Sequence, residues 1–257
     1  MLSAKKKITG EIVTAYFASP KHGPFYCLVC GDEVILKAGR KTVNHFAHIN
    51  PIACKFAVGE SDLHRRCKIE IFKALRSSPG VSNVELERPV GRNRADVSAK
   101  IHGVKVAIEV QLSSLSLETI QERTIEYFRK GVHVLWLLQW TPALDSPRYT
   151  PALWEKWIHA LYFGHAYYWL EGSTVANYRF EPHLKSVPKR SWFSPSGKKL
   201  TAGGYVQRSK RHRTAVRGHT LNIATDFGPK HRYWWQGNGS ALPDAKLFTS
   251  IARERVR

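Results

Sequence analysis

Apolar and polar residues alternate along two consecutive segments near the middle of the chain, residues 97–101 and 104–110. Alternation with a period of two is typical of β-strands that have one buried face. His102-Gly103 lies between the segments and predicts a two-residue turn, so the segments are expected to form a β-hairpin. Such a turn fixes the register. Counting back from it predicts two further cross-strand pairs, Asp96 with Glu109 and Arg94 with Gln111.

Helical periodicity flanks this hairpin on both sides. Residues 59–77 and 117–130 carry apolar residues at every third or fourth position, which predicts two amphipathic helices. The almost continuously apolar residues 132–138 predict a strand inside a covered sheet, and residues 84–89 predict a strand before the hairpin. The predicted order is therefore helix, three strands, helix, strand. Because a strand–helix–strand connection gives a parallel crossover, the sheet is expected to be mixed.

The predicted register places two carboxylates side by side. Direct cross-strand partners such as Asp96 and Glu109 have Cβ atoms roughly 4.5–5.5 Å apart, and Gln111 shares the face of Glu109. Two carboxylates this close repel each other and persist where a cation or a shared proton neutralises them. An all-oxygen group of this kind suits a hard ion such as Mg²⁺ or Mn²⁺, which keeps water ligands for chemistry. The alternative is a solvated strand face on which Arg94 supplies the counter-charge.

Two polar residues, Glu60 and His64, fall one turn apart on the otherwise apolar face of the first predicted helix. A buried polar pair needs a partner, and a metal ion or a substrate phosphate would serve. Glu60 is a candidate third acid that reaches the metal directly or through water. His64 is a candidate to hold a phosphate or to orient a water, and Lys68 falls at the edge of the same face. The alternative for His64 is a buried structural histidine.

The N-terminal part of the chain contains a candidate zinc site. Cys27-Leu-Val-Cys30-Gly has the spacing of a zinc knuckle, and His45-Phe-Ala-His48 supplies two imidazoles, so four N/S ligands complete a tetrahedral structural Zn²⁺ site. His45 and His48 point the same way on a helical turn but not on an extended strand, so Cys54 replaces one of them if the segment is extended. The alternative is a pair of buried thiols with surface histidines.

The charge balance adds a class of partner. The 257 residues include 40 Lys+Arg and 20 Asp+Glu, a formal net charge of +20, which points to a polyanion such as nucleic acid. A membrane surface is the rival partner, but no long apolar run or amphipathic basic helix supports it. Residues 5–7 are lysines that no signal-peptide core follows, and four cysteines fit a reducing compartment, so the predicted location is cytoplasmic.

The chain is basic and rich in Ser and Gly from residue 182 to residue 217, which predicts a nucleic-acid-binding segment. The candidate phosphate contacts there are Lys210, Arg211 and Arg213. The aromatic side chains available to stack on bases are Trp192, Phe193, Tyr205 and Tyr233. The alternative, which does not exclude the first, is a mobile solvated surface.

The arrangement of Asp96 followed by Glu109-x-Gln111 resembles the core of the PD-(D/E)xK nucleases, with Gln111 where Lys usually stands. A wider set of segments resembles the competence-protein CoiA-like family, namely GESDLHRRCK, RNRADV, VAIEVQLSSLS, ERTIEYFRKG and VLWLLQW. This resemblance extends from about Phe25 to about Leu170. It implies a small zinc-finger-like domain ahead of a nuclease fold and an association with the processing of incoming DNA. The nucleic-acid contacts expected within it are Lys68, Arg94, Ser113, Arg123 and Tyr127.

These patterns together predict an α+β protein in three parts. Residues 1–57 are expected to form a zinc-binding module, residues 58–140 a restriction-endonuclease-like core with a mixed sheet, and residues 141–257 a helical and hairpin extension with the basic segment. The predicted function is metal-dependent endonucleolytic or exonucleolytic hydrolysis of DNA. In it the neutral Gln111 orients a water or turns its carbonyl to the metal.

Two other functions stay open. One is a non-cleaving DNA-binding accessory protein in DNA uptake, processing or defence, which uses the nuclease fold as a scaffold. The other is an RNA-binding zinc protein. Expected partners besides DNA are a second copy of the chain or other DNA-processing proteins.

Overall fold

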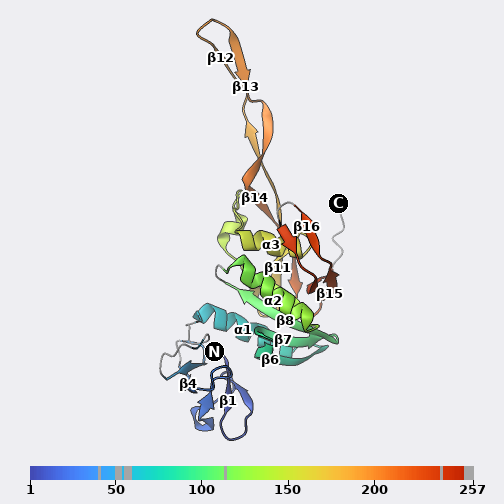
Figure 1. The fold of residues 1–257 in the computed structure, drawn as a ribbon. Helices are drawn as coiled ribbons and strands as arrows, with labels where there is room; N and C mark the ends of the chain where they lie inside the picture. Colours follow the sequence, from blue (N-terminus) through green and yellow to red (C-terminus); the bar gives the residue numbers. More distant parts are fainter. Residues whose placement is uncertain (40–41, 50–53, 55–59, 113–114, 238–239, 252–257) are drawn as a thin grey trace.

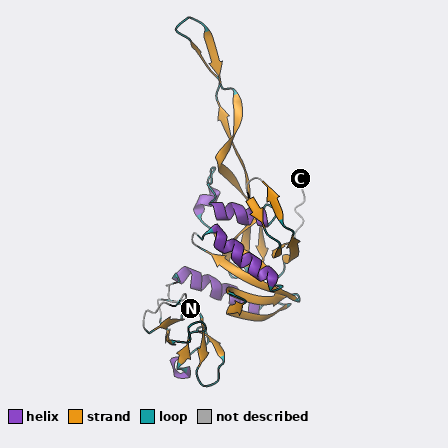
Figure 2. Ribbon diagram, in the orientation of Figure 1, coloured by secondary structure: helices purple, strands orange, loops and turns teal. Residues whose placement is uncertain are grey.

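The computed structural model describes residues 1–39, 42–49, 54, 60–112, 115–237 and 240–251. Most of the strands belong to two sheets, a small one near the N-terminus and a large one formed by later parts of the chain (Figures 1 and 2). A long two-stranded ribbon leaves the large sheet on the side away from the N-terminal sheet (Figure 1). Within the described residues, the helices are too short or too polar to cross a membrane.

The N-terminal sheet has the strand order β2-β1-β3-β4-β5. Its strands are β1 (Ser3–Lys6), β2 (Ile12–Thr14), β3 (Phe25–Tyr26), β4 (Glu33–Lys37) and β5 (His45–His48), with a short 3₁₀ turn η1 (Pro20–His22). The core beneath it is small, and two of its buried residues are Cys27 and Cys54. A core of this size contributes little stability on its own, so a metal ion bound by these thiols would stabilise the module substantially.

The large sheet has the order β14-β11-β10-β9-β8-β7-β6, and β18 pairs with both β9 and β15. Its first part follows the order α1 (Asp62–Arg76), β6 (Val81–Val90), β7 (Asn93–Ile101), β8 (Val104–Gln111), α2 (Leu117–Arg129) and β9 (His133–Gln139). Strands β6, β7 and β8 are antiparallel neighbours, whereas β8 and β9 are parallel. The predicted order of elements and the predicted mixed sheet are therefore confirmed, and the protein is α+β.

The β7–β8 hairpin turns at the predicted residues. His102 has φ 45° and Gly103 has φ 85°, the two positive values that a type I′ turn requires. The ladder runs in the predicted register from Ile101–Val104 to Val97–Ile108. Beyond it, the Asp96 carboxylate accepts the backbone N–H of Val110 at 2.9 Å, so a side chain takes up a donor past the end of the ladder.

Both predicted helices begin at side-chain caps. Ser61 Oγ accepts the N–H of His64 at 3.2 Å, and Ser116 Oγ accepts the N–H of Thr119 at 3.2 Å. Each of these bonds satisfies one of the amide groups that the first turn of a helix leaves without a partner.

The C-terminal third continues the same sheet. Strand β10 (Ala166–Glu171) pairs in parallel with β9, and the hydrophobic core is continuous on both sides of residue 140. The remaining elements are η2 (Pro142–Asp145), α3 (Leu153–Leu161), β11 (Thr174–Val187), β12 (Arg190–Phe193), β13 (Lys199–Ala202), β14 (Tyr205–Asn222), β15 (Phe227–Arg232), β16 (Trp235–Gly237), β17 (Ser240–Leu242) and β18 (Ala245–Ser250). The boundary predicted at residue 140 thus lies between two paired strands.

Candidate active site

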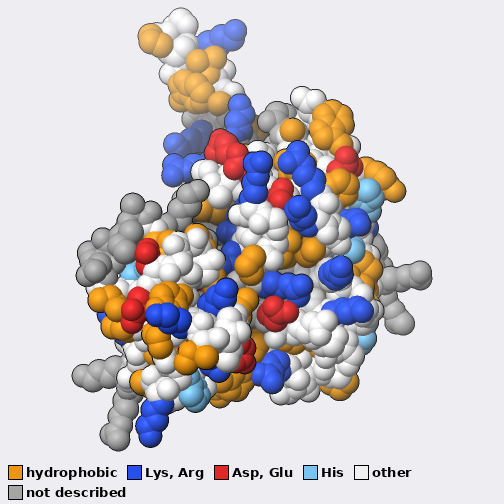
Figure 3. All heavy atoms as spheres, turned by 60° about the horizontal axis from the view of Figure 1, so that its bottom comes forward, with side chains coloured by type: hydrophobic (Ala, Val, Ile, Leu, Met, Phe, Trp, Pro, Cys, Tyr) orange, Lys and Arg blue, Asp and Glu red, His pale blue; other side chains and the backbone are white. Residues whose placement is uncertain are grey.

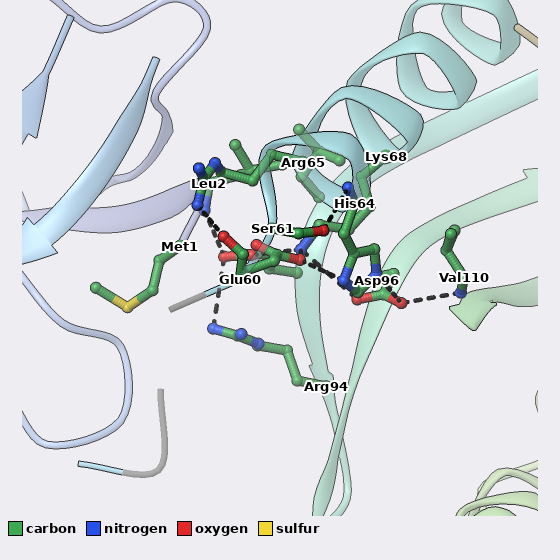
Figure 4. A network of polar contacts seen from close by, with 12 residues as sticks. Met1, Leu2, Glu60, Ser61, His64, Arg65, Lys68, Arg94, Asp96 and Val110 are labelled. Carbon is green, nitrogen blue, oxygen red and sulfur yellow. Dashed lines mark hydrogen bonds and ion pairs between the residues drawn. The ribbon is translucent and has the colours of Figure 1, made fainter. Parts of the chain in front are cut away.

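A cluster of ionisable side chains lies where the start of α1 meets β7 (Figure 4). His64 is central, with Nδ1 3.0 Å from Glu60 Oε1 and Nε2 3.3 Å from Asp96 Oδ2. The His64 side chain is 25% exposed, and those of Glu60 and Asp96 are each 16% exposed. The structure therefore brings together three of the predicted site residues at a place that solvent can reach.

Lys68 lies beneath this cluster, one turn further along α1. Its Nζ is 2.5 Å from Glu60 Oε1, 2.8 Å from Glu87 Oε1 and 3.6 Å from Asp96 Oδ1. The side chain is only 1% exposed, so it cannot reach a bound nucleic acid. The prediction that Lys68 contacts DNA is therefore wrong. Its ammonium group instead neutralises three surrounding carboxylates inside the protein.

Glu87 is the member of the cluster that the sequence analysis missed. It lies on β6 between the pairs Leu86–Val97 and Arg88–Ala95, which places it opposite Asp96. Its backbone has φ 55°, a left-handed conformation that costs on the order of 1–3 kcal/mol for a residue other than glycine. An acidic residue in a run of strand residues was the available signal. A register shift between Ser82 and Glu85, however, hides the face on which it lies.

Glu87 also joins the N-terminal sheet to the cluster. Its Oε2 accepts the backbone N–H groups of Leu2 at 2.8 Å and Ser3 at 3.1 Å, and Arg94 NH1 lies 3.4 Å away (Figure 4). Arg94, predicted as a DNA contact, therefore faces this buried carboxylate. The start of β1 is thereby coupled to the Lys68 ammonium through one fully buried side chain.

The charges of the cluster stabilise one another. Burial opposes the charge on His64, but hydrogen bonds to Asp96 and Glu60 outweigh it and raise the pKa of His64 to about 9. Burial also opposes the carboxylate charges, yet His64 and Lys68 lower the pKa of Glu60, and Lys68 holds the pKa of Asp96 well below its usual range. At neutral pH the cluster therefore contains ionised carboxylates and an imidazolium.

The buried carboxylate of Glu87 is expected to make the fold less stable in acid. Although burial opposes its charge, Lys68 and Arg94 hold its pKa at about 2, below the ordinary 4.5. Its ionisation therefore stabilises the fold above about pH 4.5, and this contribution is lost as the pH falls towards 2. We expect Glu87→Gln to remove a contribution on the order of 3 kcal/mol from the pH dependence between these values.

Urea unfolding at a series of pH values measures this contribution as a difference in slope between wild type and variant. Glu85→Gln is the matched control, because Glu85 lies on the same strand and its side chain is 50% exposed. Parallel pH curves for wild type and Glu87→Gln between pH 4.5 and 2 would contradict the assignment.

Glu109 occupies a separate, deeper position. Its carboxylate accepts hydrogen bonds from Arg123, at 2.5 Å, and from Tyr127, and it is 1% exposed. Burial outweighs the opposing charge of Arg123 and raises the pKa of Glu109 to about 7. Arg123 and Tyr127 are therefore internal partners of Glu109, and Tyr127 has no exposed surface for DNA. Gln111 is also buried, at the end of β8.

The donor set at the exposed cluster fits a divalent cation. Glu60, His64 and Asp96 each offer one ligand atom, and these atoms lie within 4.8 Å of one another. Two carboxylates with water ligands suit Mg²⁺ or Mn²⁺, and His64 would add a ligand nitrogen only as a neutral imidazole. Glu109 is not in this group because Arg123 and Tyr127 hold its carboxylate.

The cysteine cluster in the N-terminal sheet also fits its metal. Cys27, Cys30, His48 and Cys54 offer four ligand atoms within 4.8 Å of one another. The Cys27–Cys54 sulfurs are 4.0 Å apart, and Cys30 Sγ is 3.2 Å from His48 Nε2. Ligand atoms around a tetrahedral Zn²⁺ are about 3.5–3.8 Å apart, so the group needs only small adjustments.

His45 is not part of this metal cluster. Because β5 is extended, His45 and His48 point to opposite faces, and His45 Nδ1 lies 2.8 Å from the Val43 carbonyl oxygen instead. Cys54 takes the place of His45, the substitution that the extended alternative predicted.

Of the remaining predicted residues, Ser113 lies outside the described residues. Lys210, Arg211 and Arg213 lie on β14, in the protruding ribbon and remote in the chain from the cluster. Lys210 and Arg211 are exposed, whereas Arg213 donates to the backbone oxygens of Ser209 and His212.

Comparisons with known proteins agree on one family. The family described as "Competence protein CoiA, nuclease-like domain" matches residues 60–149, and "Competence protein CoiA, N-terminal domain" matches residues 14–57. The competence protein CoiA of Bacillus subtilis is 28% identical over 119 residues, which are 46% of this chain and 32% of that protein. The chain thus spans about a third of the length of this relative. No solved structure matches it.

Proposed function

The chain belongs to the CoiA-like family, and from this premise we propose that it is a metal-dependent deoxyribonuclease that hydrolyses phosphodiester bonds. The observation that carries the proposal is the convergence of Glu60, His64 and Asp96 at a solvent-accessible place within the segment that matches the nuclease-like domain. The formal net charge of +20 supports a polyanionic substrate.

Asp96 and Glu60 would hold the metal, Mg²⁺ or Mn²⁺. When bound, the ion supplies a water of lowered pKa and positive charge against the phosphate. His64 is held as an imidazolium whose two N–H groups face Glu60 and Asp96, so it would keep both carboxylates in position and place a positive charge near the phosphate. Glu109 joins them only if Arg123 gives up its 2.5 Å contact.

Lys68 supplies the positive charge that the neutral Gln111 lacks. The resemblance to PD-(D/E)xK nucleases leaves Gln111 at the position of the usual lysine. Lys68 comes from α1 instead, and its ammonium lies 3.6 Å from Asp96 and 2.5 Å from Glu60. We assign it the role of a positioning residue, which holds both carboxylates ionised and directed towards the metal.

A second part of the proposal is a structural Zn²⁺ bound by Cys27, Cys30, His48 and Cys54. The donor set, with three sulfurs and one imidazole, supports zinc over the harder ions. No open coordination position is needed for this role, since the four side chains complete a tetrahedron.

Cleavage of linear, circular and single-stranded DNA with Mg²⁺, Mn²⁺ or EDTA tests the proposal. We expect metal-dependent cutting by the wild type and a decrease in kcat of about 10²-fold or more in Lys68→Met. Lys73→Met is the matched control, because Lys73 is an exposed lysine of the same helix. No cutting with any metal, but salt-sensitive DNA binding, would contradict the proposal and favour the accessory protein.

Folding must be measured alongside this comparison. Lys68→Met leaves three buried or partly buried carboxylates without their shared cation, which costs about 3–5 kcal/mol of stability. Thermal unfolding identifies the temperatures at which the variant is folded, and kcat is compared there. If Lys68→Met does not fold, Lys68→Arg keeps the charge and tests the geometry alone.

A further inference from the structure

Strands β11 and β14 extend beyond the large sheet as a narrow arm (Figure 1). The rest of the molecule braces the arm at its base, where Tyr149 and Arg213 exchange two backbone hydrogen bonds of 2.8 Å and Thr150 Oγ1 lies 3.0 Å from His212 Nδ1. Beyond this point, residues 184–211 run out and back through the tip strands β12 and β13. At about 3.3 Å per residue, the arm is roughly 30 Å long. Because an isolated two-stranded hairpin is at best marginally stable in water, such an arm is typical of a segment that binds a partner.

The arm has the charge of a nucleic-acid-binding surface. Residues 184–211 contain five lysines and three arginines and no acidic residue. At its base, a hollow is lined by cationic and imidazole side chains, with Arg148 and His183 on one side and Arg208, Lys210 and Arg211 among the others. Among the described residues no acidic side chain lines this hollow, and such a concentration of positive charge fits backbone phosphates.

The tip adds exposed aromatic rings. Phe193 is 71% exposed and Trp192 is 48% exposed, and they lie on opposite faces of the ribbon because they are consecutive on β12. Phe193 is the cross-strand partner of Lys199, so an exposed ring and an ammonium lie side by side. Figure 3 shows hydrophobic and basic side chains together on this projection. A ring beside a cation is suited to a base and its phosphate.

We propose that this arm binds an unpaired stretch of DNA, with bases stacked on Phe193 and Trp192 and phosphates held by Lys199 and the basic hollow. Stacking a base on an aromatic side chain contributes about 5- to 150-fold in affinity. Opening a paired step to admit the ring costs a comparable factor. Stacking therefore increases the affinity for a single strand, whereas for an intact duplex the cost of opening the base pairs cancels this increase. This inference rests on the proposed function in one respect only, that the bound strand is the substrate.

The test is the binding of a fluorescent single-stranded oligonucleotide and of its duplex to the full chain, by anisotropy, in buffer without added divalent cation. We expect Phe193→Ala to weaken single-strand binding by about 5-fold or more and to leave duplex binding within 2-fold. Phe17→Ala is the matched control, since Phe17 is an exposed phenylalanine outside the arm. Lys199→Ala should weaken the binding of both the single strand and the duplex, and should reduce the slope of log affinity against log salt concentration by about one.

Binding is measured without cleavage, so a failed nuclease proposal leaves this result intact. Equal weakening of single-strand and duplex binding by Phe193→Ala would overturn the selection of unpaired bases. Single-strand binding unchanged in the double variant Trp192→Ala/Phe193→Ala would overturn the role of the tip. If the double variant cleaves DNA in a metal-dependent way and binds the single strand like the wild type, the nuclease proposal is supported and the binding role of the arm is refuted.

Discussion

Asp96→Asn is expected to abolish DNA cleavage while the protein stays folded and binds DNA. Like Glu60, Asp96 contacts both His64, at 3.3 Å, and Lys68, at 3.6 Å. Asparagine keeps its shape and can still accept the Val110 N–H, but it has no charge to offer a divalent cation. Losing several kcal/mol of charge stabilisation corresponds to a decrease in kcat of about 10³-fold or more.

Single-turnover cleavage with Mg²⁺ and with Mn²⁺ measures this loss, and anisotropy at low salt measures DNA binding. Glu85→Gln removes an exposed carboxylate from the neighbouring strand and should keep wild-type activity. Thermal unfolding shows whether Asp96→Asn is folded at the assay temperature. Cleavage by Asp96→Asn at the wild-type rate would refute the assignment of this cluster as the metal site.

Removal of zinc is expected to unfold the N-terminal sheet. Its core is small, and Cys27 and Cys54 lie within it, so the metal would crosslink strands that have little apolar packing. Structural Zn²⁺ in small domains contributes an apparent free energy of about 10–16 kcal/mol. Cys54→Ser and His48→Ala should therefore lose the metal and the β-structure of this module, whereas His45→Ala should keep both.

Metal analysis of the purified chain and far-UV circular dichroism measure the two effects. Cys67→Ser is the matched cysteine control, because Cys67 is buried in α1 within the other core. We expect one zinc per chain in the wild type and in both His45→Ala and Cys67→Ser. Zinc retained by Cys54→Ser and lost from His45→Ala would instead establish the ligand set with two histidines.

The zinc module and the active-site cluster are also expected to depend on each other. The backbone of Leu2 and Ser3 binds Glu87, and Glu87 binds Lys68 at 2.8 Å. Unfolding of the N-terminal sheet would leave the Glu87 carboxylate without these two donors. A loss of cleavage in Cys54→Ser would therefore not by itself place the zinc at the reacting phosphate.

Local chemistry was sufficient to predict much of the central fold from the sequence. The turn at His102-Gly103 and the alternation around it determine the hairpin, since a two-residue turn leaves one register. The apolar periodicity predicts both helices, and in the structure Ser61 and Ser116 cap them, because each side chain accepts the amide three residues further on. Glu60 and His64 were found because a polar pair on an apolar helix face requires a partner. The helix was predicted from residue 59, however, whereas α1 begins at Asp62, so Glu60 lies just before the helix and only His64 lies on it.

Tertiary structure alone decided which charges meet. The sequence predicted that Lys68 contacts DNA, but in the structure its ammonium is buried against Glu87. Glu87 reaches this position through a register shift in β6 that no local sequence pattern indicates. Glu109 faces Arg123 and Tyr127 rather than the exposed cluster because these two side chains reach it from α2. Likewise, the extended β5 excludes His45 from the metal cluster. These outcomes depend on contacts between segments that are distant in the sequence, and local residue patterns carry no information about the energies of such contacts.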